Sequence, residues 1–257
     1  MTVWSAPGPG LPGPGAAAVA SALVVGHRGG RGEGWPAENT LAAFDQARTQ
    51  GARAIELDVR TTAGGDVVVF HDETLERMTA GGDVRPISTL SLGELQRVDI
   101  GRGARVPLLA EVLAWARSFD VAVNVEMKHE VASRPALARR TQKVVREARA
   151  DVLLSSFDPL LLAMAGAFDP RVPRALLTHA KQDRWADVLA AAVRPPAVQA
   201  VHIERTQAGP RVGRYLQKGL RVGAWTVNDP LEGRALAESG VASIITDHAG
   251  EMIAALC

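Results

Sequence analysis

Short runs of β-branched residues alternate with longer amphipathic stretches from residue 21 to the end of the chain. This alternation is typical of βα units, in which a helix connects each strand to the next parallel strand. The candidate strands cover residues 21–26, 53–59, 121–126, 151–155, 172–177, 198–202, 221–226 and 242–246. Because a closed TIM-type (β/α)8 barrel takes ~250 residues as one domain, eight such units in 257 residues predict this α/β fold.

The amphipathic stretches predict helices over residues 39–50, 109–118, 134–148, 158–167, 184–193, 209–218, 230–238 and 249–256. Several begin beside a residue whose side-chain oxygen can cap the first turn, namely Asn39 or Thr40, Asp158, Asp229 and Asp247. A proline follows both Asp158 and Asp229, at a position that the first turn of a helix tolerates. The starts of these helices are therefore better defined than their ends.

One stretch departs from the alternation of strands and helices. The run DVVVF at 66–70 follows the strand 53–59 across a glycine-containing turn, which predicts an antiparallel hairpin rather than a helical crossover. This hairpin returns His71 to the level of Asp58, because antiparallel partners lie only ~5 Å apart. Residues 73–107 then form a small insertion over the mouth of the barrel.

The amino-terminal region is expected to be a tail outside the barrel. Residues 1–20 form this flexible tail, because the stretch 1–15 is rich in proline and glycine, and residues 21–257 form the domain. The apolar run AAAVASALVV is typical of a secretory signal, but residues 1–15 lack the Lys or Arg that a signal peptide needs. No run is long enough for a transmembrane helix. We therefore expect a cytoplasmic protein without stable membrane insertion.

The composition is typical of a soluble globular protein, with 47% hydrophobic and 22% charged residues. The formal net charge is +1 and the basic residues are scattered, which argues against a nucleic-acid partner. The single cysteine, Cys257, excludes an internal disulfide and suits a reducing compartment. The composition indicates no particular oligomeric state.

Three carboxylates lie near the ends of two neighbouring predicted strands. Glu56 and Asp58 are two residues apart, so both side chains point to the same face, and Glu126 ends the next parallel strand. Adjacent carboxylates repel each other unless a cation or a partner neutralises them. Solvation of both Glu56 and Asp58, or their pairing with Arg53 and Arg60, is one alternative. Three oxygen donors without a nearby cysteine favour the second alternative, in which the carboxylates bind a hard divalent cation. This cation would be Mg²⁺ or Ca²⁺, for which Mn²⁺ could substitute.

Two histidines accompany these carboxylates. His27 and His71 each follow an apolar strand-like run, and both titrate near neutral pH. A lone histidine at a strand end is more often structural, whereas two histidines beside a carboxylate cluster predict an acid/base pair. The cationic side chains of Arg28 and Lys128 could face a bound phosphate. Glu38 could orient Arg28 or His27.

These residues occur in a series of short motifs along the chain. The series is His27-Arg28-Gly29, Glu38-Asn39-Thr40, Glu56-Leu57-Asp58, His71-Asp72, Glu126 with Lys128, Ser156-Phe157, Trp225-Thr226-Val227-Asn228 and Thr246-Asp247. In order and approximate spacing it resembles the glycerophosphodiester phosphodiesterases, from about Val24 to the last helix. The resemblance implies a metal bound by the three carboxylates, catalysis by the two histidines and a substrate pocket with Trp225 in its wall. Core packing is the alternative for Trp225.

The chain departs from the family pattern at three places. Ala37 separates Pro36 from Glu38, where the family has a contiguous Pro-Glu-Asn-Thr. Ala242-Ser243 replaces a usual Asp-Gly, and Pro107-Leu108-Leu109 replaces Pro-Thr-Leu. All three departures lie outside the five candidate metal and acid/base residues. They bear on loop geometry and on specificity.

The predicted function is metal-dependent hydrolysis of a small glycerophosphodiester to an alcohol and glycerol 3-phosphate. Either histidine can serve as the base, with the other as the acid. One alternative is a lysophospholipase D-like enzyme that cleaves lipid headgroups, for which we expect an exposed apolar patch at the mouth. Another is a noncatalytic phosphate-binding barrel, which we expect to lack at least one of the five residues. All five are present.

Overall fold

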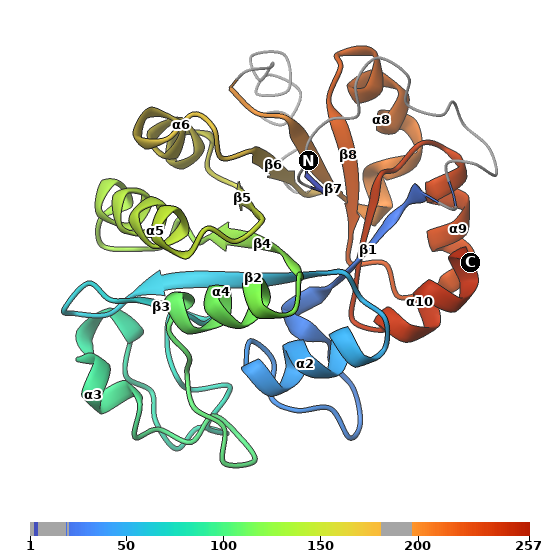
Figure 1. Cartoon of the computed structure of the whole chain (residues 1–257). Helices are drawn as coiled ribbons and strands as arrows, with labels where there is room; N and C mark the ends of the chain where they lie inside the picture. Colours follow the sequence, from blue (N-terminus) through green and yellow to red (C-terminus); the bar gives the residue numbers. More distant parts are fainter. Residues whose placement is uncertain (1–2, 5–18, 20, 181–196) are drawn as a thin grey trace.

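The computed structural model describes residues 3–4, 19, 21–180 and 197–257. Within these ranges eight parallel strands close into a barrel, because β1 pairs with both β2 and β9 (Figure 1). The strands are β1 (Leu23–Gly26), β2 (Ala54–Thr61), β4 (Ala122–Met127), β5 (Val152–Ser156), β6 (Arg174–Thr178), β7 (Ala200–Glu204), β8 (Arg221–Trp225) and β9 (Ser243–Thr246). Each overlaps a predicted strand, so the predicted (β/α)8 barrel is confirmed.

Helices surround the barrel (Figure 1). They are α2 (Leu41–Thr49), α4 (Leu109–Ser118), α5 (Arg134–Ala148), α6 (Pro159–Phe168), α8 (Arg205–Gln217), α9 (Pro230–Glu238) and α10 (Ala249–Leu256). Four of them, α4, α5, α9 and α10, have the predicted bounds. Helix α8 begins at Arg205 rather than at residue 209. The predicted helix 184–193 lies outside the described residues.

Three of the predicted helix caps are confirmed. Thr40, Asp158 and Asp229 each accept a hydrogen bond from a backbone N–H in the first turn of the helix that follows. The predicted cap at Asp247 is wrong. Helix α10 has His248 at its N-cap position, without a side-chain bond, because the Asp247 carboxylate binds other side chains at the barrel mouth.

The hairpin has the predicted register. Strand β3 (Val67–Val69) runs antiparallel to β2, and the backbone N–H of Phe70 donates to the carbonyl of Asp58 at 2.9 Å. The chain then continues through a short 3-10 helix, η2 (Ile87–Thr89), and a single helical turn, α3 (Leu92–Leu95), before it reaches α4. This segment has its own small core, made of Val68, Phe70, Leu75, Ile87, Leu90, Leu95, Ile100 and Val106.

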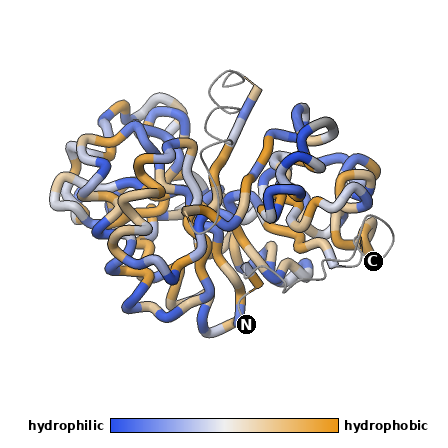
Figure 2. Tube along the Cα trace, turned by 90° about the horizontal axis from the view of Figure 1, so that it is seen from above, coloured by the Kyte–Doolittle hydropathy of each residue, from blue (hydrophilic) through white to orange (hydrophobic). Residues whose placement is uncertain are grey.

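The main core lies between the strands and the surrounding helices. In Figure 2 hydrophobic stretches run through the central strands, and hydrophilic ones are frequent on the outside. A second, smaller cluster lies inside the barrel, mostly at the amino-terminal ends of the strands, and consists of Trp4, Val25, Ala54, Ala122, Leu153, Ala175, Ala200 and Ile245. No helix of the described ranges is long and apolar enough to cross a membrane.

Two residues of the predicted tail contact the barrel. Trp4 is 5% exposed, and the backbone N–H of Val3 donates to a carboxylate oxygen of Asp151 at 2.8 Å. The Arg221 guanidinium donates to the Val3 carbonyl at 2.8 Å. Asp151 precedes β5 and Arg221 begins β8, so Trp4 covers the end of the barrel opposite to the carboxyl ends of the strands. Residues 1–2, 5–18 and 20 lie outside the described residues.

Burial of Trp4 makes a stability prediction. Trp4→Ala should lower the free energy of unfolding by about 3 kcal/mol, because it removes a buried indole and leaves a cavity. Denaturant unfolding, followed with an unchanged m-value, measures the difference. Leu231→Ala is the control, because Leu231 is 79% exposed and its loss should change little. Equal unfolding midpoints for Trp4→Ala and the unaltered protein would contradict the packing of this tail residue.

Candidate active site

The predicted site residues converge at the carboxyl ends of the barrel strands. A small cavity of about 80 Å³ lies there. Its lining includes His27, Arg28, Glu56, His71, Glu126, Lys128 and Trp225, together with Asn124 and Phe157. Asp58 and Glu38 lie just behind this lining, and both contact Arg28.

Three carboxylates share one buried volume beside the cavity. Ligand oxygens of Glu56, Asp58 and Glu126 lie within 4.8 Å of one another, and Asp58 and Glu126 are register partners on β2 and β4. Burial, together with the negative charges of Asp58 and Glu126, raises the pKa of Glu56 well above its usual value. Oxygen donors at this spacing suit a hard divalent cation, which would relieve the repulsion. The donor set therefore fits a bound metal ion.

Two cations partly neutralise these carboxylates. The Arg28 guanidinium Nε lies 3.3 Å from Asp58 Oδ2, and the Lys128 ammonium lies 2.8 Å from Glu126 Oε1 and 3.5 Å from Asp58 Oδ1. Burial alone would raise the pKa of Asp58, but Arg28 and Lys128 hold it below its usual value. The alternative pairing with Arg53 and Arg60 is wrong. Arg53 is exposed, and Arg60 donates to the backbone carbonyls of His71 and Glu130.

The turn after β1 brings Arg28 over the carboxylates. This turn is the short helix η1 (His27–Gly29), in which Arg28 has a φ of +52° and its backbone N–H donates to Glu56 Oε2 at 3.0 Å. Gly29 follows with a φ of +88°, and a Cβ there would lie 2.7 Å from the backbone of Ala43. Only glycine fits such a position.

His27 is held by a carboxylate from the last strand. Its Nδ1 lies 2.7 Å from Asp247 Oδ1, and its Nε2 lies 4.0 Å from Glu56 Oε2. Arg31 Nε donates to Asp247 Oδ1 at 3.0 Å, and the Asn228 amide donates to Asp247 Oδ2 at 2.9 Å. Burial lowers the pKa of His27, although Asp247 opposes this effect. The ring is thus fixed through Nδ1, with Nε2 on the side of the three carboxylates.

His71 has a similar arrangement on the opposite side of the cluster. Its Nδ1 lies 2.6 Å from Asp72 Oδ1, and Arg77 Nε donates to Asp72 Oδ2 at 2.6 Å. The same Arg77 guanidinium donates to both oxygens of Glu38, at 2.7 and 3.2 Å. Burial is the main reason why the pKa of His71 is lowered. Arg77 therefore connects the histidine after β3 with the loop after β1.

Glu38 lies at the junction of these contacts. Besides Arg77, it accepts a hydrogen bond from Arg28 at 2.9 Å, and Arg31 lies 3.7 Å away. Of the two predicted partners of Glu38, Arg28 is the one that it binds.

Trp225 both packs and lines the cavity. Its indole N–H donates to the His202 carbonyl at 3.1 Å.

Sequence reasoning missed several residues that hold the site together. Asp72 stands beside His71 in the sequence, which is a usable signal. Asp247 stands in a recognised motif, but 220 residues from His27, so the sequence does not indicate this partner. Asn39, whose amide donates to Asp58 Oδ2 at 3.0 Å, also stands in such a motif. Arg31 and Arg77 lie in loops, where no local pattern indicates their partners. Phe157 also lines the cavity, and its ring packs edge-on against that of Trp225, with the two ring centroids 5.5 Å apart.

Comparison with known proteins agrees with this geometry. A glycerophosphodiester phosphodiesterase of Caldanaerobacter subterraneus is 31% identical over 90% of this chain and 96% of its own. The crystal structure of an Agrobacterium tumefaciens glycerophosphodiester phosphodiesterase superposes with a TM-score of 0.75 at 28% identity, covering 91% of this chain and 99% of its own.

A phosphodiesterase of Oleispira antarctica, solved with its product sn-glycerol-3-phosphate, gives a TM-score of 0.80 at 25% identity. The match covers 91% of this chain and 96% of that one. The model of the glycerophosphoryl diester phosphodiesterase family matches residues 27–251, from the first histidine into the last helix. The chain therefore belongs to the glycerophosphoryl diester phosphodiesterase family.

Proposed function

We propose that this enzyme hydrolyses glycerophosphodiesters to an alcohol and glycerol 3-phosphate, with a divalent cation at Glu56, Asp58 and Glu126 and with His27 and His71 as the acid/base pair. One observation carries the proposal. Two histidines, each fixed through Nδ1 by its own carboxylate, flank a buried cluster of three carboxylates at the barrel mouth. The glycerol 3-phosphate bound by the Oleispira relative supports the same substrate class.

A phosphodiester resists attack because its negative charge repels nucleophiles and because its leaving group is a poor one. The bound cation would supply positive charge to the phosphate. Arg28 and Lys128 add fixed positive charge beside the same volume, and both are buried or nearly so. The aromatic ring of Trp225 would exclude water from one side of the bound glycerol.

The two histidines would move the protons. A carboxylate at Nδ1 favours the tautomer with the proton on Nδ1, which leaves Nε2 able to accept a proton. Burial lowers the pKa of both rings, which favours the neutral form that a general base needs. One ring, neutral, would take the proton of the attacking hydroxyl on Nε2, and the other, protonated on both nitrogens, would give its Nε2 proton to the departing alkoxide.

The lipid alternative requires an apolar patch at the mouth. Among the large apolar side chains of the described residues that are exposed, Leu41, Leu160 and Leu231 lie in the first turns of α2, α6 and α9, at the same end as the site. They follow β1, β5 and β8, no two of which are neighbours in the sheet, so these side chains do not form one continuous surface. A small polar substrate is therefore the better fit.

Metal dependence is the first expected property. Against a panel of glycerophosphodiesters, the purified protein should lose turnover on chelation and regain it with Mg²⁺, Ca²⁺ or Mn²⁺. The melting temperature should also rise with the added ion, because a ligand that binds only the folded state stabilises it. Glu126→Gln should weaken both responses.

Glu111→Gln is the matched control, because Glu111 lies on the neighbouring helix α4, away from the cluster. It should keep both responses to the ion. Full turnover by a demonstrably metal-free preparation would refute the metal assignment. Absence of turnover on every diester with every ion would refute the proposed function.

Arg77 should affect the rate of catalysis although it lies outside the cavity. Arg77→Met should lower kcat roughly tenfold, the size of effect that follows loss of an outer partner that orients a catalytic group. KM should change little. Arg85→Met is the control: both arginines lie in the same segment, pair with an aspartate and have side chains 47% and 49% exposed. Within the part of the chain that the structure describes, however, the Arg85 side chain pairs with Asp83 alone, whereas Arg77 pairs with both Asp72 and Glu38.

Comparison of Arg77→Met with Arg85→Met distinguishes a positioning role of Arg77 from a general effect of surface charge. If Arg77 acts through Asp72, Arg77→Met should add little to the loss caused by Asp72→Asn, because residues in one chain of contacts are not additive. Equal kcat values for Arg77→Met and Arg85→Met would show that Arg77 does not position His71.

A further inference from the structure

One polar side chain in the wall of the small cavity differs from its neighbours. Asn124 is 1% exposed, and neither its amide oxygen nor its amide nitrogen forms a hydrogen bond within the described residues. The charged side chains of the same wall each bond to another residue, namely His27, Arg28, Glu56, His71, Glu126 and Lys128. A buried amide without a partner is costly and uncommon. The amide of Asn124 is therefore a candidate for binding the substrate.

Strand β4 places Asn124 deeper in the barrel than Glu126. The two residues are two positions apart, so both side chains point into the barrel, and Asn124 is the register partner of Glu56 on β2. Because a strand advances ~3.3 Å per residue, the Asn124 backbone lies about 7 Å closer to the amino-terminal end of β4 than that of Glu126. Leu177 and Ile245 line the same cavity. The wall thus combines one unpaired amide with apolar surface.

This combination restricts the group that can bind there. An amide has both donors and an acceptor, so a matching ligand must accept and donate. An ionised phosphate oxygen only accepts, and a metal ion would satisfy only the amide oxygen. A hydroxyl group does both, and the carbon that carries it would contact Leu177 and Ile245. Water also does both, but it makes no use of the apolar surface. The wall therefore suits a hydroxymethyl group.

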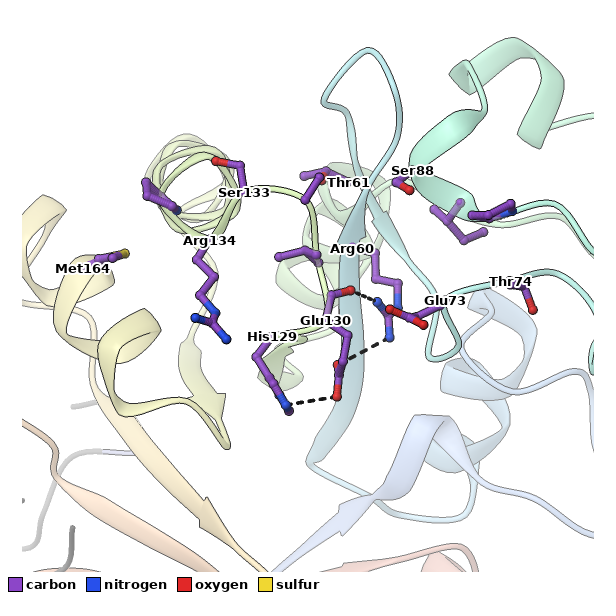
Figure 3. A pocket seen from close by; sticks show the side chains of 15 residues that line it. Arg60, Thr61, Glu73, Thr74, Ser88, His129, Glu130, Ser133, Arg134 and Met164 are labelled. Carbon is purple, nitrogen blue, oxygen red and sulfur yellow. Dashed lines mark hydrogen bonds and ion pairs between the residues drawn. The ribbon is translucent and has the colours of Figure 1, made fainter. Parts of the chain in front are cut away.

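The size of the cavity indicates which end of a diester enters it. A volume of about 80 Å³ admits only a small group. A second cavity, of about 860 Å³, lies beside the site along the segments that follow β2 and β4 (Figure 3). Glu130 in its wall lies 3.7 Å from Arg60 and 3.1 Å from His129 (Figure 3). An alcohol of any size has room on that side, whereas the glycerol end is small and constant.

We propose that Asn124 binds the terminal hydroxyl of the glycerol end, the hydroxyl farthest from phosphorus, and so selects glycerol diesters. The inference rests on the proposed phosphodiesterase function. Arg28 and Lys128 attract the phosphate at the carboxyl ends of the strands. A glycerol that extends inward from this phosphate presents its terminal hydroxyl to the amide. A diester without that hydroxyl would leave the buried amide unpaired, and the site would bind it less well.

The test compares two diesters of ethanol, one with glycerol and one with propylene glycol phosphorylated at its primary carbon. The second lacks only the terminal hydroxyl and keeps the hydroxyl beside the phosphorylated carbon. The unaltered enzyme should favour the glycerol diester in kcat/KM by roughly tenfold to a hundredfold, the effect expected when a buried polar group loses its partner. Asn124→Leu keeps the size of the side chain without the amide, and it should remove most of this preference.

Thr178→Val is the matched control. Thr178 ends β6, and its hydroxyl is likewise buried without a hydrogen-bond partner among the residues that the structure describes, but it does not line the cavity. This variant should keep the preference of the unaltered enzyme. If Asn124→Leu does not fold, Asn124→Ala gives the same comparison. The two diesters also test the role of the terminal hydroxyl in the unaltered enzyme, without any substitution.

Three results would overturn the assignment of Asn124. The first is equal kcat/KM of the unaltered enzyme for the two diesters. The second is a loss by Asn124→Leu of the same factor on both diesters, which would leave the phosphodiesterase function intact. The third is a weaker rise of the melting temperature with added ion in Asn124→Leu, with the preference kept, which would place the amide at the metal. Failure of the unaltered enzyme to turn over either diester would overturn the proposed function as well.

Discussion

Repulsion among three buried carboxylates is the constraint on which the rest of the site depends. Glu56, Asp58 and Glu126 are brought together by strand alternation and by the parallel register of β2 and β4. A cluster of this kind is unfavourable in a low-dielectric interior unless positive charge accompanies it. Arg28 and Lys128 supply part of that charge, and the oxygen donors that remain suit a divalent cation.

Ion pairs between acidic and basic side chains also hold the surrounding loops. Acidic and guanidinium groups alternate outward from the cluster, from Asp58 through Arg28, Glu38 and Arg77 to Asp72. The second histidine lies at the end of this chain of contacts. The loop after β1 and the segment after β3 are therefore held in one arrangement, although no strand pairing joins them. Such a network fixes both the position and the tautomer of a catalytic histidine.

Local sequence patterns predicted the features that local forces determine. The hairpin register followed from the glycine-containing turn and from β-strand spacing, and it placed His71 next to the carboxylates. The bounds of α4, α5, α9 and α10 followed from amphipathic periodicity, with a predicted capping residue, Asp229, at the start of α9. These features depend on interactions between residues close in the chain, which a single sequence contains.

The missed features depend on long-range contacts. The sequence predicts Asp247 as a helix cap, but an aspartate between a strand and a helix can serve either that helix or the barrel mouth. Its contact with His27 spans 220 residues, and the choice is made by a histidine on a different strand. Arg60 was a candidate partner of the carboxylates, but the backbone carbonyls of the hairpin and of the loop after β4 bind it instead. Neither choice of partner can be predicted from the local sequence, because both depend on contacts that form only in the closed barrel.

The two histidines are proposed to act as acid and base on one phosphodiester. The most direct measurement compares His27→Ala and His71→Ala on two glycerol diesters, one with an alkyl alcohol and one with a nitrophenol as the leaving group. A nitrophenolate leaves without a proton, so the variant that lacks the general acid should recover most of its kcat on that diester. The variant that lacks the base should remain slow on both. If both variants lose the same factor on both diesters, the histidines do not divide the proton transfers, and the account is contradicted.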